Sequence, residues 1–448
     1  MTAGTFSVFP ASNGQKKKTE ADRMNRIAKP ISSILAALLL LGSCANVTPD
    51  PADKPEDGAV ESDTLHAQIP LAAASKDPTG AEADARVTDA VTSFSERFYK
   101  EAVKQADGNV ILSPLSLYYA LALTSNGAAG DTKAEFEAAL GMPTDELNEY
   151  LYTLTNKLAA SENSTMDVAN SVWGNAANFT LSADFQKVAQ AYYSAEASSL
   201  PFDADALNTI NGWVSEKTDG MIPNLLDELD PESVMVLVNA VLFDGVWEEE
   251  YEEQDVSKGT FTTADGKDLR ADFLYSTEYG YFETDGGVGF SKPYKDGYRF
   301  VAVLPDPGTD VNAFTAQMDL EGILKSAYDS NRKCLVSIPK FEYETSLGLN
   351  DVAKALGVNR AFTDAAELGG LSADGVNNIA ISAILQKAKV ILNEHGTKAA
   401  AATGLVFNTT AFRPDPTPEV YLDRPFFFAI ADADGIPLFM GTVMDPTK

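Results

Sequence analysis

Hydrophobic positions recur at helical spacing early in the chain. Val91, Phe94 and Phe98 fall three to four residues apart, as on one face of an amphipathic helix. A second helix is predicted over residues 132–140, a run of good helix formers that ends at Gly141. This part of the chain is therefore expected to be mainly helical.

Continuous apolar runs dominate the later part of the chain and predict strands. Because these runs do not alternate with polar residues, they indicate central strands that are buried on both faces. The runs cover residues 234–238, 300–304, 335–338 and 420–430. Helices first and strands later predict an α+β fold, and residues 86–448 contain no further Pro/Gly-rich linker, so we expect one large domain there.

The N-terminal region reads as an export signal. Basic residues precede an apolar run from Ile31 to Leu41, about 11 residues, which suits the core of a signal peptide and is half of what a membrane-spanning helix needs. The run ends in Gly42-Ser43-Cys44, and small residues before a cysteine resemble a bacterial lipoprotein signal. Residues 1–44 are therefore interpreted as a lipoprotein signal segment that ends at a lipidated Cys44. The alternative is an ordinary cleaved signal with an incidental cysteine.

Residues 45–85 are rich in Pro, Ala and Asp and poor in large apolar side chains. Such a segment cannot bury enough surface to offset the entropy of ordering, so it is predicted to be a disordered tether. Behind a lipid anchor it would hold the folded body away from a membrane. The predicted location is exported and lipid-anchored, at the bacterial cell envelope or cell surface.

The chain is strongly acidic. It has 34 Lys and Arg against 65 Asp and Glu, a formal charge of −31. This charge argues against a nucleic-acid partner, which requires a positive surface. It favours solubility of an exported protein, with attraction of cationic partners as the alternative.

Only two cysteines and two histidines occur in the chain: Cys44, Cys334, His66 and His395. This scarcity excludes a disulfide scaffold and a Cys/His zinc site, and it leaves almost no material for a histidine-dependent catalytic triad. We therefore expect no metal, no cofactor and no enzymatic activity. Cys334 precedes a predicted strand and is interpreted as a structural thiol.

One short segment matches an enzyme motif in residue type and spacing. Ser337 and Lys340 match the Ser-x-x-Lys of penicillin-binding proteins. That motif needs a helical turn, which Pro339 within a β-branched run opposes, and the partner Lys-Thr-Gly is missing. The match is therefore interpreted as accidental.

The most unusual segment, residues 393–404, follows an apolar strand-like run. Read as a strand, its side chains divide between two faces. One face would carry Thr397, Ala399, Ala401 and Thr403, and the other Lys398, Ala400, Ala402 and Gly404. Such small side chains suit both a solvated loop and insertion between two strands; a solvated Ala-rich helix is the alternative. Alternating prolines then keep residues 414–418 extended and exposed.

Several motifs together resemble the serpin family, and the likeness covers residues 86–448. They occur in the family's order, which makes the set specific although each motif alone is weak. The motifs are residues 109–116, 127–132, 210–214, 237–243, 338–341, 356–362, 423–428 and 438–443. The resemblance implies the serpin fold, with about three β-sheets, eight to nine helices and an exposed reactive-centre loop.

The resemblance also implies a suicide-substrate inhibitor of serine proteases, expected to act as a monomer. In this family the protease cleaves the loop and forms an acyl-enzyme. The cleaved loop then inserts into the main sheet and traps the protease before deacylation. The alternative is a non-inhibitory serpin-fold binding protein that is cleaved as an ordinary substrate. Small hinge residues favour inhibition, and here the expected hinge is Glu394, Gly396, Thr397, Ala399, Ala400, Ala401, Ala402 and Thr403.

The family's usual interval from Gly396 implies that the cleaved bond is Thr410–Ala411. Other registers place Thr409, Phe412 or Phe407 at the primary specificity position. A threonine suits elastase- or subtilisin-like proteases, and a phenylalanine suits a chymotrypsin-like one. Arg413 precedes a proline, which makes trypsin the least favoured target.

The family likeness places six further residues where the main sheet opens: Ser113, Ser116, Asn239, Trp247, Lys340 and Gln386. Gln386 stands where the family usually has histidine, and its amide is expected to bond with groups such as Ser113, Ser116 and Asn239. Lys340 and Glu394 are expected to form an ion pair near Trp247 that holds the root of the loop. The alternative for this pair is a solvated surface contact of little energy.

Overall fold

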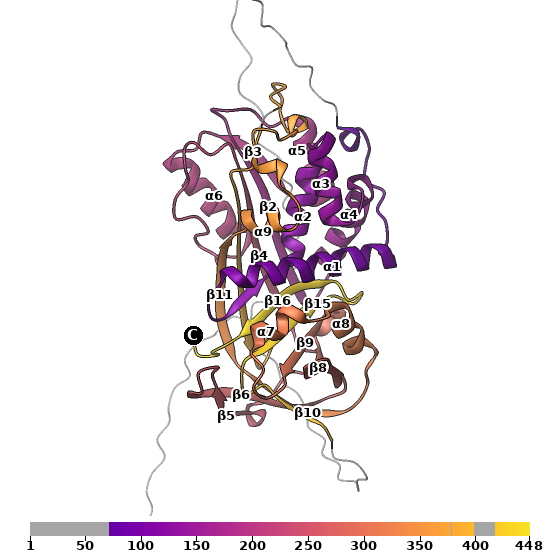
Figure 1. Cartoon of the computed structure of the whole chain (residues 1–448), viewed down its shortest axis with the longest axis vertical. Helices are drawn as coiled ribbons and strands as arrows, with labels where there is room; N and C mark the ends of the chain where they lie inside the picture. Colours follow the sequence, from indigo (N-terminus) through magenta and orange to yellow (C-terminus); the bar gives the residue numbers. More distant parts are fainter. Residues whose placement is uncertain (1–70, 378, 398–416) are drawn as a thin grey trace, which may run out of the picture. The chain divides into compact units, whose positions relative to one another are not determined.

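The structure is a computed structural model that describes residues 71–377, 379–397 and 417–448 (Figure 1). Within these ranges the chain forms nine α-helices and three β-sheets, which confirms the predicted α+β fold. The predicted signal segment with Cys44, and also His66, lie outside the described residues.

Six of these nine helices precede the second half of the chain, as the early periodicity predicts. They are α1 (Ala85–Ala102), α2 (Pro114–Ser125), α3 (Gly130–Leu140), α4 (Thr144–Ala159), α5 (Ala183–Tyr193) and α6 (Ala204–Lys217). The later ones are α7 (Val311–Gln317), α8 (Leu320–Asp329) and α9 (Asn350–Ala355).

The strands form one main sheet and two others. The main sheet has the order β11 (Phe341–Gly348), β12 (Ala383–Asn393), β13 (Gly396–Thr397), β4 (Met235–Val246), β2 (Ser164–Asn175) and β3 (Glu196–Leu200). A second sheet has the order β1 (Val110–Leu112), β16 (Pro437–Val443), β15 (Phe426–Ala431), β9 (Arg299–Pro305), β8 (Gly287–Pro293) and β7 (Phe282–Thr284). The third has the order β14 (Glu419–Tyr421), β10 (Cys334–Pro339), β6 (Asp268–Glu278) and β5 (Val256–Thr262).

Local sequence explains where the helices begin and end. Asp84 caps α1 by accepting a hydrogen bond from the Val87 N–H at 3.1 Å, and Ser113 caps α2 in the same way. Gly141 ends α3 with a φ of +76°, a left-handed conformation that glycine adopts without strain. The predicted end of this helix is therefore confirmed.

Strand β4 is buried on both faces, as its continuous apolar run predicts. Side chains such as Leu237 and Val241 pack into the main core, whereas Val236 and Val238 pack into a second cluster with Ile210 of α6. Helix α6 therefore covers one face of the main sheet, and α2 lies on the other side (Figure 1).

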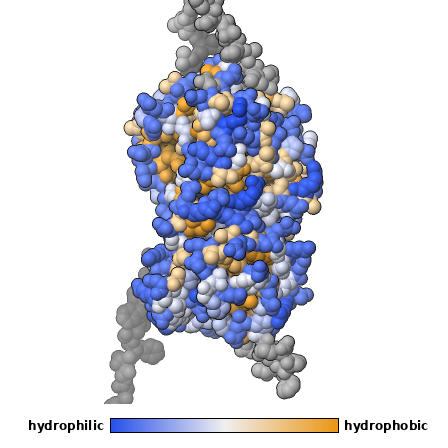
Figure 2. Space-filling model, viewed as in Figure 1, coloured by the Kyte–Doolittle hydropathy of each residue, from blue (hydrophilic) through white to orange (hydrophobic). Residues whose placement is uncertain are grey.

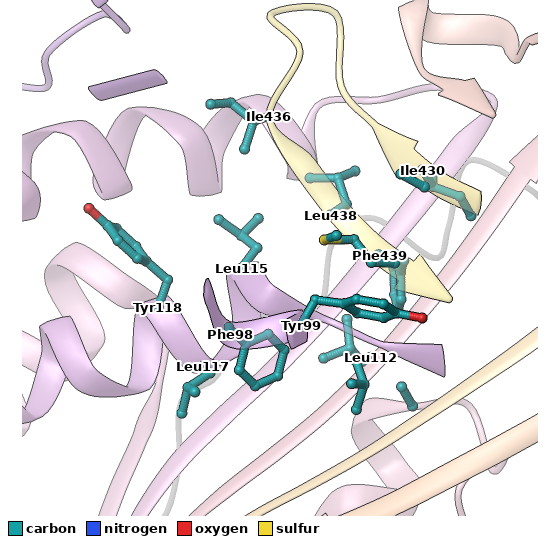
Figure 3. Packing of buried hydrophobic residues seen from close by; sticks show 14 of the residues in the cluster. Phe98, Tyr99, Leu112, Leu115, Leu117, Tyr118, Ile430, Ile436, Leu438 and Phe439 are labelled. Atoms are coloured by element: carbon teal, nitrogen blue, oxygen red, sulfur yellow. The ribbon is translucent and has the colours of Figure 1, made fainter. Parts of the chain in front are cut away.

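The main core joins the first helices to the C-terminal strands. Phe98 and Tyr99 of α1 and Leu115 of α2 lie close to Leu438 and Phe439 of β16, and all five are buried (Figure 3). Burial of each such side chain contributes about 1.5–3 kcal/mol. These contacts join β16 to helices α1 and α2 in one core.

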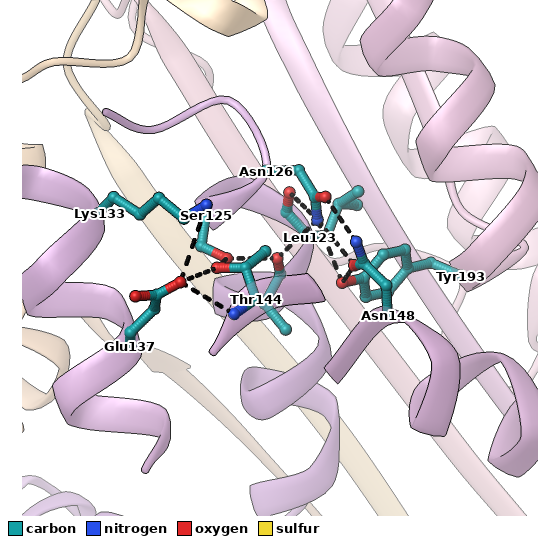
Figure 4. A network of polar contacts seen from close by, with 9 residues as sticks. Leu123, Ser125, Asn126, Lys133, Glu137, Thr144, Asn148 and Tyr193 are labelled. Carbon is teal, nitrogen blue, oxygen red and sulfur yellow. Dashed lines mark hydrogen bonds and ion pairs between the residues drawn. The ribbon is translucent and has the colours of Figure 1, made fainter. Parts of the chain in front are cut away.

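Polar contacts also join the helices to one another (Figure 4). Asn126, which follows α2, exchanges two hydrogen bonds with Asn148 of α4, at 3.0 and 2.8 Å. Tyr193 of α5 donates to the same Asn148, and the Thr144 N–H donates to Glu137 of α3 at 3.0 Å. The helices therefore form a firm support beneath the main sheet.

One predicted strand is wrong in its extent. The apolar run 420–430 forms two strands, β14 and β15, which belong to different sheets. The break falls at Asp423-Arg424-Pro425, where the proline cannot donate a ladder hydrogen bond.

The predicted tether is also shorter than expected. Residues 71–84 are ordered against the body, although they fall within the predicted disordered segment 45–85. Leu71 and Ala74, at the start of this segment, join the main core and are only 8% and 7% exposed. Composition alone misses this because a single leucine in a Pro- and Ala-rich segment gives no periodic signal.

A carboxylate of the body fixes the same segment. Glu149 of α4 accepts hydrogen bonds from the Thr79 and Gly80 N–H groups at 2.8 and 2.7 Å. Partial burial raises the pKa of the Glu149 carboxyl, but these hydrogen bonds outweigh it and hold the pKa below its ordinary value. The folded protein therefore favours the charged form of Glu149.

The described residues expose few large hydrophobic side chains. The face in Figure 2 is mainly hydrophilic, and among the described residues the exposed large hydrophobic side chains are Tyr275 and Tyr279. No helix in the described ranges has the length and hydrophobicity needed to cross a bilayer.

Replacing Glu149 with Ala should free residues 71–84 and destabilise the protein by about 2 kcal/mol, since hydrogen bonds to a charged group contribute about 1.5–3 kcal/mol. Thermal unfolding and hydrogen exchange of residues 71–84 would measure this. Glu146→Ala is the matched control on the same helix, because its partner Arg86 is exposed and such pairs contribute little. Equal effects of the two changes would contradict the role of Glu149.

The effect should depend on pH. Because the pKa of Glu149 is lowered in the folded state, its stabilisation is complete above the ordinary pKa of glutamate and is lost as the pH falls through the lowered value. The difference between the wild type and Glu149→Ala should therefore be full at pH 7 and disappear well below about pH 4. A difference that persists in strong acid would contradict this assignment.

Candidate functional site

In the main sheet, strand β13 consists of only two residues and lies between two longer strands. Strands β12 and β4 pair directly and in parallel, from Ala383 opposite Val236 to Lys389 opposite Leu242. Beyond that pair they separate, and β13 lies between them and is antiparallel to both. The sheet is therefore closed along most of its length and open by one strand at this end, which we call the opening.

Two residues of the predicted hinge fill the opening. Thr397 is 1% exposed, and its hydroxyl lies 2.7 Å from the hydroxyl of Tyr294. Gly396 has a φ of +149°, and a Cβ there would lie 1.9 Å from the Gly245 carbonyl oxygen. Only glycine fits this position. Gly396 and Thr397 therefore fit the space between β12 and β4, which we call the seat.

A tight turn joins β12 to β13. The segment that follows β4 holds this turn through backbone contacts: the Trp247 N–H donates to the carbonyl of His395 at 3.0 Å, and the Tyr251 N–H donates to that of Glu394 at 2.9 Å. The Trp247 indole N–H also donates to the Asn393 carbonyl at 3.0 Å. We call Trp247–Tyr251 the clasp.

The predicted ion pair at the root of the loop is present. Lys340 Nζ lies 2.6 Å from Glu394 Oε2, and both side chains are 31% exposed. Partial burial raises the pKa of Glu394, but the contact with Lys340 helps to hold it below its ordinary value. The pair is neither buried nor fully solvated.

Aromatic rings form the floor of the opening. Trp247 stacks on Tyr294 with ring centroids 4.1 Å apart, and burial raises the pKa of Tyr294, so that its hydroxyl stays protonated. Beneath them, Lys292 Nζ contacts Glu278 Oε1 at 2.8 Å and lies over the rings of Trp247 and Tyr251. This buried ion pair fixes the aromatic floor.

Further along the sheet, the predicted amide network is only partly formed. Gln386 exchanges hydrogen bonds with the backbone of Ser113, at 3.0 and 2.8 Å. Ser116 bonds instead with Asn170 of β2, at 3.1 Å. Asn239 is fully buried, and neither atom of its amide has a partner within the described part of the chain.

The remaining predicted site residues lie outside the described residues. They are the hinge positions Ala399, Ala400, Ala401, Ala402 and Thr403, the expected bond Thr410–Ala411, and the alternatives Phe407, Thr409 and Phe412.

The residues in the described ranges contain no group of three or more His, Cys, Asp or Glu side chains suited to a metal ion. Cys334 is buried, and burial raises the pKa of its thiol to about 11, so it is not a nucleophile at neutral pH. Ser337 lies in strand β10, so the Ser-x-x-Lys match lacks its helical turn.

Sequence reasoning missed three contributors to the opening: Tyr294, Glu250 and His395. His395 Nδ1 lies 2.9 Å from Glu250 Oε2. The acidic run that follows Trp247 is the one signal that would have pointed to Glu250. For Tyr294 the sequence carries no comparable signal, since its contact with Thr397 joins distant parts of the chain.

Comparison with known proteins gives one consistent result. The family model described as serpin (serine protease inhibitor) matches residues 89–446. A serpin-like protein of Thermococcus kodakarensis is 31% identical, over 80% of this chain and 86% of its own length. The leukocyte elastase inhibitor of Bos taurus is 32% identical, over 76% of this chain and 93% of its own length.

Solved structures agree and distinguish two states. The native state of the thermophilic serpin Tengpin has a TM-score of 0.77 and 36% identity, covering 84% of this chain and 100% of its own. The latent state of Tengpin has a TM-score of 0.71 and 35% identity, covering 82% and 100%. The higher score for the native state accords with the direct pairing of β12 and β4. Its sequence, its fold and the short strand β13 in its main sheet agree with these comparisons: the chain belongs to the serpin family.

Proposed function

We propose that this protein is a suicide-substrate inhibitor of serine proteases that traps the acyl-enzyme by inserting its cleaved loop into the main sheet. The observation that carries the proposal is the seat of Gly396 and Thr397 between β12 and β4. The hinge is already the first part of the strand that insertion would complete.

The register of this seat supports continued insertion. A strand that continued β13 would pair Thr403 with the residues six positions before Leu392 and Gly245, which are Gln386 and Asn239. Odd-numbered loop residues would face the core as Thr397 does. These are Ala399, Ala401 and Thr403, whereas Lys398 would face outward. The Thr403 hydroxyl would then reach the level of the Asn239 amide, which has no partner in the described chain.

The energy of insertion is sufficient for mechanical work. A new central strand would form about 12 ladder hydrogen bonds at about 1 kcal/mol each. That sum rivals the total stability of an ordinary domain, about 5–15 kcal/mol. Insertion can therefore displace and distort an attached protease.

The threonines around the expected bond favour an elastase- or subtilisin-like target. A relative at 32% identity bears the name leukocyte elastase inhibitor, which accords with this choice. A non-inhibitory binding protein on the same fold remains the second candidate, and the small residues that follow Thr397 argue against it. As a further part of the proposal, Cys44 carries a lipid anchor that holds the inhibitor at a bacterial cell envelope.

Incubation of the protein with pancreatic elastase or subtilisin should yield a complex of the summed mass that survives boiling in SDS. Chymotrypsin and trypsin serve as comparisons. Mass spectrometry of the released C-terminal peptide should place the cleavage at Thr410–Ala411. Clean cleavage without a complex, and with undiminished activity of all four proteases, would favour the non-inhibitory alternative.

Thr397→Arg should convert the inhibitor into a substrate. The seat of Thr397 is buried, and burying an unpaired charge costs about 3–5 kcal/mol, which would slow insertion by about two to four orders of magnitude. The stoichiometry of inhibition measures this change. Thr397→Ser is the matched control, since it keeps the hydroxyl that contacts Tyr294. Efficient trapping by the Arg variant would exclude insertion through this seat.

Glu394→Gln tests the ion pair with Lys340. The pair is partly exposed, so its loss should lower stability by about 1 kcal/mol or less and should also change the rate of loop insertion. Glu342→Gln is the control, because Glu342 forms a more exposed pair with Lys389 on the same sheet. If Glu394→Gln left both the insertion rate and the thermal midpoint unchanged, the pair would have no role at the loop's root.

A further inference from the structure

Four contacts join the clasp to the turn that carries the hinge. Three of them use backbone carbonyls of the turn, at Asn393, Glu394 and His395. The fourth joins two side chains, with His395 Nδ1 2.9 Å from Glu250 Oε2. This fourth contact joins two polar side chains, so a substitution can remove it without changing a backbone group.

The contact between His395 and Glu250 is partly shielded from water, since the two side chains are 28% and 21% exposed. Lys295 Nζ lies 3.6 Å from the other carboxylate oxygen of Glu250, and Glu394 beside His395 is paired with Lys340. Both carboxylates near His395 thus have a lysine partner as well.

We propose that Glu250 is a positioning residue for loop insertion, and that it acts through His395. The pair holds the turn from which the inserted strand grows. This inference rests on the proposed function, because it concerns the start of the insertion that traps a protease.

The topology explains why a firm turn would speed insertion. Gly396 and Thr397 are already paired with both neighbouring strands. Each following loop residue then needs only to form its own pairs beside the last one. If the turn were loose, the first pairs would have to form again, and starting a hairpin is slower than extending it. Loss of the contact between Glu250 and His395 should therefore slow insertion.

The first test is hydrogen exchange of residues 393–397 in the intact, full-length protein, with correction for intrinsic exchange. Glu250→Gln should lower protection about fivefold, the effect of losing one hydrogen bond of typical strength. His395→Gln should lower protection by a similar factor, and Glu250→Asp should restore part of the protection.

Glu249→Gln is the matched control, because Glu249 is exposed and adjacent to Glu250 on the same segment. It should behave as the wild type does. If Glu250→Gln and Glu249→Gln have equal effects, Glu250 does not hold the turn and the proposal fails.

The second test follows insertion by tryptophan fluorescence after a protease, in excess, has nicked the loop. Wild type and Glu250→Gln are compared under the same conditions with the same protease. The variant should insert about fivefold more slowly than the wild type. Equal rates would overturn the positioning role.

This readout needs cleavage of the loop and does not need a covalent complex. It therefore tests the role of Glu250 even if no protease is trapped, an outcome that would count against the proposed function alone.

Discussion

The structure depends on a two-residue strand held between two longer ones. Strands β12 and β4 pair directly along most of their length, yet at one end Gly396 and Thr397 separate them. This arrangement leaves an opening at that end of the main sheet, where further loop residues would pair in the proposed insertion. In that proposal the inserted loop completes a sheet with more hydrogen bonds than the intact protein has.

The surrounding residues hold the two-residue strand in place. Aromatic rings and a buried ion pair form a floor under Thr397. The helices beneath the sheet are tied together by the network around Asn148. The amide of Asn239 in β4 is one of several buried polar groups without a partner within the described ranges, and it lies opposite Gln386, at the level where an inserted Thr403 would pair.

Much of this could be predicted from sequence, and the exceptions have physical reasons. The strand runs, the Gly-Thr hinge and the Lys340–Glu394 pair followed from local pattern and family likeness. The Tyr294 contact did not, since it joins residues 103 positions apart. Nor did the order of residues 71–84, which depends on Glu149 of a distant helix. The isolated amide of Asn239 also needed the register of three strands.

Thermal unfolding of the intact protein, compared with that of the protein cleaved in its loop, tests whether the sheet is unfinished. About 10 kcal/mol gained on insertion should raise the midpoint by about 20 °C or more, at about 2 °C per kcal/mol for a domain of this size. The cleaved chain should also show new amide protection in β4 and β12. A cleaved protein that unfolds at the same temperature as the intact one, with no added protection, would show that no better-bonded sheet is available.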